Sequence, residues 1–300
     1  MNKESHDNKL NLLQLPNADD DATYQIRDLF IGSTINGERN KIISADFSNL
    51  EVRILTHFSG DENLLKMFEN CEDVHGSTAV NMFELDCDSH EVKKKYPHLR
   101  QAAKVLNFML LYGSGAKSLY EALKNDHYSP MDLGEESYLK QYKCKNGIEV
   151  AQVYIDKYFA SYKGVAKFIK DQKRFAHKNG YVQTILGRKR RLPFIHSNNY
   201  GEVSYAERLS VNSMVQGTGA DIMISAQNLI HADERLKELG ALMIIQVYDE
   251  LVFECPEENV EEATNIIVGY MQNMFGDKTK ILKLDFIADA GQGWSYQEAK

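Results

Sequence analysis

The stretch ALMIIQVYDELVFEC, residues 241–255, is the most informative part of the sequence. Two apolar runs are separated there only by YDE, residues 248–250. A gap of this length between apolar runs is typical of a β-hairpin, so we expect two antiparallel strands. Asp249 and Glu250 then lie where the two strands meet. A charged group at such a place is costly unless another group compensates its charge.

A second acidic residue, Asp46, ends the apolar run KIISADF at residues 41–47, which we also expect to be a strand. Carboxylates brought together from two strands repel each other and raise each other's pKa. A divalent cation removes that cost, and two Mg²⁺ ions held about 3.5–4 Å apart suit in-line phosphoryl transfer. The residues alone also allow a simpler interpretation, a tight turn at 248–250, because Asp favours turns.

Residues 99–112 have helical character, and Gly113 and Gly115 follow as a stop signal. Four side chains spaced by four residues form one stripe on this expected helix, namely Arg100, Lys104, Phe108 and Tyr112. Two cations followed by two aromatic rings match the order of the parts of a nucleoside triphosphate. An amphipathic helix with a buried aromatic end and a solvated cationic end is the alternative.

The rest of the chain alternates between helical and strand patterns. The patterns predict helices over 149–178, 202–239 and 257–274, a strand that begins over 181–186 and turns at Gly187 through a basic loop over 188–194, and a final strand over 282–288. The polar first twenty residues are expected to form a tail. Together the patterns predict an α/β chain.

The composition excludes several classes of protein. Hydrophobic residues make up 43% of the 300 residues, which is ordinary for a globular chain and excludes wholesale disorder. The net charge of −8 excludes a uniformly basic surface. Residues 163–191 nevertheless contain ten basic side chains and one acidic one, Asp171. This basic segment indicates either a polyanion bound along one surface or a solvated helix face followed by a charged turn.

The four cysteines are far apart and show neither a C-x-x-C pair nor the spacing of a zinc site. Reduced thiols in a cytoplasmic protein are the simplest interpretation. No apolar run reaches the roughly 18 residues that a membrane span needs, so we expect no membrane partner.

Three segments resemble the conserved motifs of the family A, polymerase-I-like DNA polymerases. DFSNLEVRILTHFSGD at 46–61 resembles motif A, RQAAKVLNFMLLYGSG at 100–115 resembles motif B, and QVYDELVFE at 246–254 resembles motif C. The segments at 73–79, 185–193 and 207–221 are also similar to family segments, in the family order. The resemblance covers nearly the whole chain from about residue 10.

The resemblance implies the palm of a right-hand polymerase, an antiparallel sheet, together with helical fingers. The implied division is an amino-terminal tail and palm over 1–58, fingers over 59–180 and palm over 181–300. Only 45 residues precede Asp46, too few for a thumb or a 3′–5′ exonuclease domain. Residues 10–16 resemble the end of the preceding palm segment. We therefore expect a split, phage-type polymerase subunit whose thumb and exonuclease lie on a second polypeptide, acting in the host cytoplasm.

The resemblance also implies the roles of individual residues in metal and nucleotide binding. Asp46, Asp249 and the backbone carbonyl of Phe47 fall on the ligands of two Mg²⁺ ions, with Glu250 as an auxiliary acid. The triphosphate contacts fall on His75, Arg100 and Lys104, and Lys104 is also the expected proton donor to pyrophosphate. Phe108 falls beside the incoming sugar, Tyr112 at the template and insertion site, and Glu51 where a ribose 2′-OH would lie.

Four positions match residues that line the primer–template minor groove, namely Arg208, Asn212, Gln216 and Gln246. Minor-groove acceptors are shared among base pairs, which suits a polymerase without sequence preference. Tyr248 stands where the family has a histidine that contacts the primer terminus, and its hydroxyl is the expected replacement.

Structural alternatives remain for some of these residues: His75 as a capping or core histidine, Glu51 as a solvated helix residue, and Arg208 as an ion-pair partner of Glu207 or Glu202. The implied function is a template-directed DNA polymerase that uses primer–template DNA and deoxynucleoside triphosphates and releases pyrophosphate. The alternatives are a single-subunit RNA polymerase, which Glu51 opposes, and a non-catalytic DNA-binding or assembly subunit of a polymerase complex.

Overall fold

The computed structural model describes residues 26–35, 37–126, 131–276 and 282–300. The tail expected at the amino terminus and the segment at 10–16 lie outside these residues. The chain forms two compact units. Unit 1 consists of Met1–Leu50, Ile222–Ile281 and Asp285–Lys300, and unit 2 consists of Glu51–Asp221 and Leu282–Leu284.

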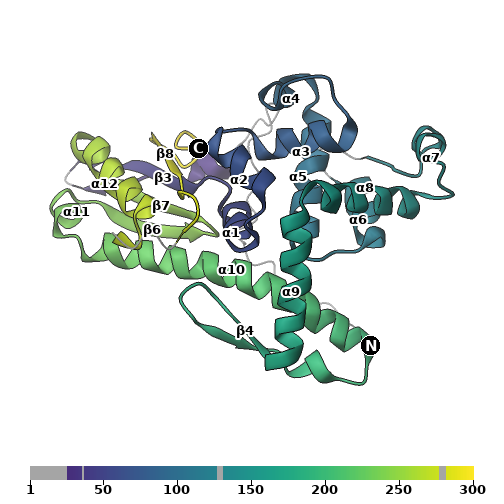
Figure 1. Ribbon diagram of the computed structural model, residues 1–300. Helices are drawn as coiled ribbons and strands as arrows, with labels where there is room; N and C mark the ends of the chain where they lie inside the picture. Colours follow the sequence, from purple (N-terminus) through teal and green to yellow (C-terminus); the bar gives the residue numbers. More distant parts are fainter. Residues whose placement is uncertain (1–25, 36, 127–130, 277–281) are drawn as a thin grey trace, which may run out of the picture. The chain divides into compact units, whose positions relative to one another are not determined.

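Unit 1 is built on a four-stranded antiparallel sheet with the strand order β6-β7-β3-β8 (Figure 1). The strands are β3 (Lys41–Phe47), β6 (Leu242–Val247), β7 (Glu250–Cys255) and β8 (Ala288–Gly293). The predicted strand at 41–47 and the predicted hairpin at 241–255 are confirmed. The α/β class with an antiparallel sheet is confirmed as well.

The two central strands of the sheet carry the acidic residues. Every residue of β7 is buried, and the apolar side chains of β3 are buried with it. Helix α12 (Val260–Gln272) packs against β3 and β8. The other elements of unit 1 are η2 (Ile26–Leu29), β1 (Thr34–Ile35), β2 (Glu38–Arg39), α11 (Glu234–Glu238) and η4 (Glu257–Asn259).

The predicted strand at 282–288 is wrong, because the strand that pairs with β3 is β8, which begins at Ala288. The sequence of β8, ADAGQG, lacks the apolar alternation that marks a strand. Its two glycines are required by packing: a Cβ at Gly291 would lie 2.4 Å from the carbonyl oxygen of Ala299, and one at Gly293 would lie 2.3 Å from the Cβ of Glu298. Residues 298–299 thus pack directly against the backbone of β8, and this contact requires glycine at both positions.

Unit 2 is mainly helical, with one two-stranded hairpin. Its elements are α1 (Leu50–Ser59), α2 (Glu62–Glu69), α3 (Val74–Phe83), α4 (Ser89–Lys95), α5 (Pro97–Leu111), α6 (Ala116–Lys124), α7 (Glu136–Tyr142), α8 (Gly147–Ser161), α9 (Lys163–Asn179), β4 (Tyr181–Gln183), β5 (Lys189–Arg191) and η3 (Pro193–His196). The helix predicted over 99–112 corresponds to α5. The strand predicted to begin at 181 and turn through a basic loop corresponds to β4 and β5.

The single helix predicted over 149–178 is wrong, because α8 ends at Ser161 and α9 begins at Lys163. Asp61 explains the break. One oxygen of its buried carboxylate caps α2, and the other accepts hydrogen bonds from the backbone N–H groups of Gly164 (2.7 Å) and Val165 (3.3 Å) at the start of α9. A carboxylate that binds the N–H groups of a helix start stabilises that start, so two helices begin at one side chain.

Helix α10 (Tyr200–Ala232) contributes residues to both units. The helix predicted over 202–239 is interrupted at Asp233, whose side chain caps the short helix α11. Although α10 has 33 residues, no helix in the described parts of the chain is both long and apolar enough to cross a membrane.

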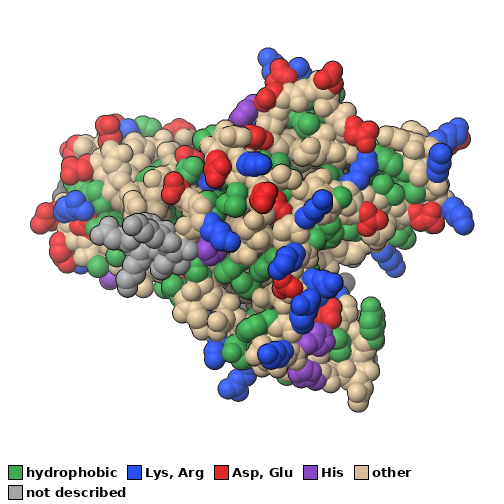
Figure 2. Space-filling view, in the orientation of Figure 1, with side chains coloured by type: hydrophobic (Ala, Val, Ile, Leu, Met, Phe, Trp, Pro, Cys, Tyr) green, Lys and Arg blue, Asp and Glu red, His purple; other side chains and the backbone are tan. Residues whose placement is uncertain are grey.

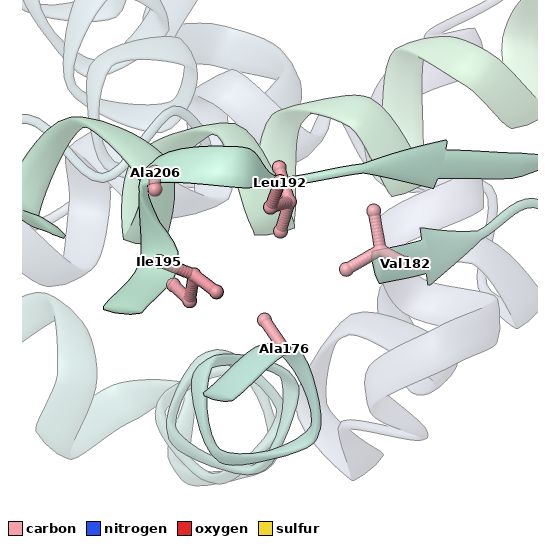
Figure 3. Packing of buried hydrophobic residues seen from close by; sticks show 5 residues of the cluster. All are labelled: Ala176, Val182, Leu192, Ile195 and Ala206. Atoms are coloured by element: carbon pink, nitrogen blue, oxygen red, sulfur yellow. The ribbon is translucent and has the colours of Figure 1, made fainter. Parts of the chain in front are cut away.

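The β4–β5 hairpin is fixed in unit 2 by a small hydrophobic cluster (Figure 3). The cluster consists of Ala176 on α9, Val182 on β4, Leu192, Ile195 on η3 and Ala206 on α10. All five side chains are almost fully buried. The hydrophobic cluster therefore holds the strand that carries the basic residues of β5 against α9 and α10.

We predict that Asp61→Ala lowers the free energy of unfolding by about 2–4 kcal/mol, because two helix starts lose their cap and each cap contributes up to about 2 kcal/mol. Urea unfolding measures the change. The control is Asp88→Ala, which removes an exposed cap from α4 alone and should cost about 1 kcal/mol. Equal losses in the two variants would contradict the double role of Asp61.

Candidate active-site residues in the two units

Three acidic residues meet where β3 ends and β7 begins, within unit 1. Asp46 lies opposite Glu250 in the register of the two strands. The backbone N–H of Phe47 donates to the carbonyl of Asp249 (3.3 Å), which holds the two strand ends together. Burial, and next to it the charge of Asp249, raise the pKa of Asp46 to about 6. The structure therefore brings together Asp46 and Asp249, as the sequence predicts.

Glu250 is in a different situation, because its carboxylate already has three partners. It is 3% exposed and accepts hydrogen bonds from the hydroxyls of Ser44 (2.5 Å) and Tyr296 (2.8 Å). The ammonium group of Lys300 lies 2.9 Å from one of its oxygens. Glu250 thus connects β3, β7 and the last residues of the chain.

Sequence reasoning missed these partners of Glu250. Ser44 could have been found, because it lies two residues before Asp46 and so shares its face of the strand. Tyr296 and Lys300 lie outside every motif that we used, and only the fold brings them to the carboxylates.

The residues at this place fit a magnesium ion. Asp46 Oδ1 is buried and accepts no hydrogen bond from any residue that the structure describes, which is costly for an acceptor. Carboxylate oxygens are the ligands that Mg²⁺ prefers, and it often takes only one or two of them from the protein, with the rest from water and substrate phosphates. The described residues hold no group of three or more His, Cys, Asp or Glu side chains arranged as a metal site. A pair of carboxylates that leaves the remaining ligand positions to groups from outside the protein is the arrangement that these residues allow.

The turn between β6 and β7 is braced by Gln246. Its amide nitrogen donates to the backbone carbonyl of Tyr248 (3.1 Å), and its amide oxygen accepts from Gln227 on α10 (2.9 Å). Tyr248 has a left-handed backbone conformation (φ 55°) and a side chain that is 66% exposed. The turn therefore presents the Tyr248 ring to solvent, next in sequence to Asp249.

The cationic end of the predicted stripe on α5 is held by Asp73, within unit 2. Two nitrogens of the Arg100 guanidinium contact the Asp73 carboxylate at 2.5 and 3.0 Å. Burial alone would raise the pKa of Asp73, but the hydrogen bonds and charge of Arg100 outweigh it, and the pKa is lowered. Asp73 also caps α3 through the backbone N–H of His75. Arg100 is thus oriented by the start of a neighbouring helix.

His75 is a neutral, buried side chain beside this ion pair. Burial, with the charges of Arg100 and Lys104, lowers its pKa to about 4. Its Nδ1 lies 3.0 Å from the amide nitrogen of Asn107, which donates, so the proton resides on Nε2. The rings of His75 and Phe108 are 5.9 Å apart. The structure therefore groups His75 with Arg100 and Phe108, and it adds Asn107, a buried residue that the sequence reasoning missed.

The aromatic end of the stripe contacts Glu51. The hydroxyl of Tyr112, directly after the end of α5, donates to the Glu51 carboxylate. Burial raises the pKa of Glu51, and the hydrogen bond from Tyr112 opposes that change. Glu51 is therefore a half-buried, hydrogen-bonded residue rather than a solvated one. Lys104, between the two ends of the stripe, is exposed.

Three of the four residues predicted to line the minor groove share one face of α10, since Arg208, Asn212 and Gln216 follow at intervals of four, whereas Gln246 lies on β6. Arg208 is exposed and donates to Ser204 (3.0 Å). The alternative that Arg208 pairs with Glu207 is not what the structure shows, because the Glu207 carboxylate lies 3.1 Å from Lys173 and 3.0 Å from His177.

The basic segment 163–191 forms α9 and the β4–β5 hairpin, and Lys and Arg side chains follow both elements in Figure 2. Part of its charge is paired: Lys167 contacts Asp171 (2.6 Å) and Arg188 contacts Asp221 (2.8 Å). The three residues of β5, KRR, are all exposed. The hairpin therefore offers a row of exposed cations.

Comparisons with known proteins agree with these observations. The model of the family described as DNA polymerase family A matches residues 6–298. DNA polymerase I of Thermus filiformis is 35% identical over 259 residues, which cover 86% of this chain and 27% of that protein. DNA polymerase I of Borreliella burgdorferi is 35% identical over 255 residues, covering 85% and 25%. The chain thus spans about a quarter of the length of these relatives.

A solved structure has the same fold. It is described as the POL domain of Pol1 from M. smegmatis in complex with DNA primer-template and dNTP. Its TM-score is 0.75 at 29% identity, over 96% of this chain and 45% of that chain. Both sequence and fold therefore show that the chain belongs to DNA polymerase family A.

Proposed function

We propose that this chain is the catalytic part of a template-directed DNA polymerase that acts in DNA replication. It would add deoxynucleotides to a primer 3′-OH and release pyrophosphate. The observation that carries the proposal is the pairing of β3 with β7, which brings Asp46 to Asp249. The buried Oδ1 of Asp46 accepts no hydrogen bond from the described part of the chain. The family supports it, as does the M. smegmatis domain described with DNA primer-template and dNTP.

Asp46, Asp249 and the backbone carbonyl of Phe47 would hold two Mg²⁺ ions. When bound, such ions lower the pKa of an attacking hydroxyl and neutralise the charge of a departing pyrophosphate. The protein residues would contribute positioning: the strand ends fix both carboxylates, and Glu250, held by the hydroxyls of Ser44 and Tyr296, shares the ammonium group of Lys300 with Asp46. Glu250 would thus act as an auxiliary acid through its support of Asp46.

The triphosphate would bind to unit 2 at the residues grouped around the start of α5. Arg100 and Lys104 supply positive charge, and His75 supplies a neutral N–H donor from Nε2. Lys104 is exposed and would also donate a proton to pyrophosphate. Phe108 would lie beside the sugar and Tyr112 at the insertion site, with Glu51 excluding a 2′-OH. Glu51 thereby opposes a function as an RNA polymerase.

Primer–template DNA would contact, in unit 2, the face of α10 that carries Arg208, Asn212 and Gln216, and, in unit 1, Gln246 and Tyr248. Exposed cations on β5 would add contacts to phosphates, which position a duplex without reading its sequence. The palm and fingers would correspond to the divisions 1–58, 59–180 and 181–300 that the family motifs imply.

A second polypeptide that carries a thumb and a 3′–5′ exonuclease would complete a split, phage-type polymerase in the host cytoplasm. One observation supports this proposal. The edge strand β6 exposes Leu242, Met243 and Ile244, between 39% and 58% each. Exposed apolar side chains in a group are typical of an interface.

We predict that Asp249→Asn lowers the rate of primer extension by about 10²- to 10⁴-fold, the loss expected when a key charge-stabilising group is removed. The assay uses a labelled primer–template, Mg²⁺ and the four deoxynucleoside triphosphates. The control is Glu234→Gln, which changes an exposed acid of unit 1 that pairs with Lys237. Unchanged extension by Asp249→Asn would refute the metal assignment, and no extension by the wild type would favour the non-catalytic subunit.

We also predict a pH-dependent effect of His75. Its folded-state pKa of about 4 lies below the ordinary 6.5, so its contribution to stability is complete above pH 6.5 and is lost as the pH falls toward 4. In the wild type, His75 should lower the free energy of unfolding by about 2 kcal/mol when the pH falls from 7 to 5, and His75→Gln should lack this decrease. Urea unfolding at both pH values measures it, with exposed His90→Gln as the control. An equal pH effect in the wild type and His75→Gln would contradict the buried neutral state.

For the second polypeptide, we predict that co-expression with a polypeptide carrying thumb and exonuclease sequences yields one complex in gel filtration. Primer extension by the complex should exceed that of the chain alone, because a thumb holds the duplex. Separate elution, together with full extension by the chain alone, would refute the split arrangement.

A further inference from the structure

We propose that Lys300 is a positioning residue of the carboxylate site, whose ammonium group binds Asp46 and Glu250 and competes there with Mg²⁺. This proposal rests on the metal site of the proposed function. It adds a residue that no motif identifies. The expected effect of this residue is to raise the concentration of divalent cation at which the site is half-saturated.

The geometry carries the proposal. The Nζ atom of Lys300 lies 2.9 Å from Glu250 Oε2 and 3.7 Å from Asp46 Oδ2. The Lys300 side chain is 27% exposed and that of Glu250 is 4% exposed, so the closer contact is largely screened from water. The attraction between opposite charges is stronger where water is partly excluded than between two exposed side chains.

The anchor of the ammonium group is Glu250 rather than Asp46. Glu250 is fixed by the hydroxyls of Ser44 and Tyr296, whereas the Asp46 side chain is 46% exposed and its contact with Lys300 is longer. Lys300 can therefore release Asp46 while it remains bound to Glu250. Mg²⁺ could therefore replace the ammonium group at Asp46 while the ion pair between Lys300 and Glu250 remains.

The position of Lys300 is set by the packing of the residues before it. Tyr296 and Ala299 are buried in a hydrophobic cluster with Ile42 and Val252. The backbone N–H of Tyr296 donates to the carbonyl of Phe30 (2.8 Å). The last residues of the chain are thus docked on unit 1, and the ammonium group is delivered to the carboxylates by a fixed backbone.

Electrostatics gives the direction of the effect. Asp46, Asp249 and Glu250 are three carboxylates at two adjoining strand ends, and a nearby ammonium group reduces their mutual repulsion. A divalent cation that binds Asp46 must replace that contact, so its apparent affinity falls by the factor that the contact contributes. Removal of the ammonium group should therefore lower the thermal stability of the protein when no divalent ion is present. It should also raise the affinity of the site for divalent ions.

The test compares Lys300→Met with the wild type in thermal unfolding over a series of Mg²⁺ concentrations, without DNA or nucleotide. Lys300→Met should unfold at a lower temperature without Mg²⁺. Its half-saturating Mg²⁺ concentration should be about three- to fivefold lower than that of the wild type, as expected for removal of a partly exposed ion pair. Binding of Mn²⁺, followed by electron paramagnetic resonance, should show the same ratio.

Two further variants separate competition from a general loss of packing. Lys300→Arg retains the charge and should keep the half-saturating concentration of the wild type. Lys41→Met makes the same substitution at the far end of β3, where Lys41 pairs with Glu257 at 2.9 Å, and should leave that concentration unchanged. If Lys300→Met does not fold, Lys300→Gln replaces it in every measurement.

Equal half-saturating concentrations in the wild type and Lys300→Met would overturn the proposal and leave the metal site intact. A wild type that neither gains stability from Mg²⁺ nor binds Mn²⁺ would overturn the metal site and this proposal together. The primer-extension result for Asp249→Asn is independent of both, so failure of the proposed function can be told apart from failure of the role of Lys300.

Discussion

The antiparallel pairing of β3 with β7 is the constraint on which the candidate chemistry depends. Six consecutive register pairs run from Lys41 opposite Cys255 to Asp46 opposite Glu250. The buried apolar side chains of both strands fix this register, because a slip by one residue would turn every side chain to the other face. The fold thereby forces acidic residues from distant parts of the sequence into one place, and the free energy of burying the strands outweighs the repulsion between them.

In unit 2, helix starts perform the same organising role that strand ends perform in unit 1. Asp73 caps α3 and at the same time orients Arg100, and Asp61 caps α2 and also holds the start of α9. In each case one carboxylate joins two elements, so the positions of the side chains follow from the backbone. His75 shows the result: it is buried, neutral and hydrogen-bonded, ready to donate without carrying charge.

How much the sequence could predict differs between the elements. β3 and the β6–β7 hairpin were predictable because an apolar run, a short gap and an acid are local signals. β8 was not, since its glycines serve contacts with residues near the end of the chain. The break between α8 and α9 escaped prediction for the same reason, because Asp61 lies about a hundred residues away. At the site, the ends of apolar strands supplied Asp46 and Asp249, and the four-residue spacing of a helix supplied Arg100. Ser44, Asn107, Tyr296 and Lys300 depend on contacts distant in sequence.

The two glycines of β8 have a consequence for variation in this chain. At Gly291 and Gly293 even the smallest side chain, a methyl group, would collide with Ala299 or Glu298. An alanine there would push the docked end of the chain away from the sheet, and with it the Tyr296 hydroxyl and the cation that follows. The contacts of Tyr296 and Lys300 with Glu250 therefore depend on the absence of a side chain at Gly291 and Gly293.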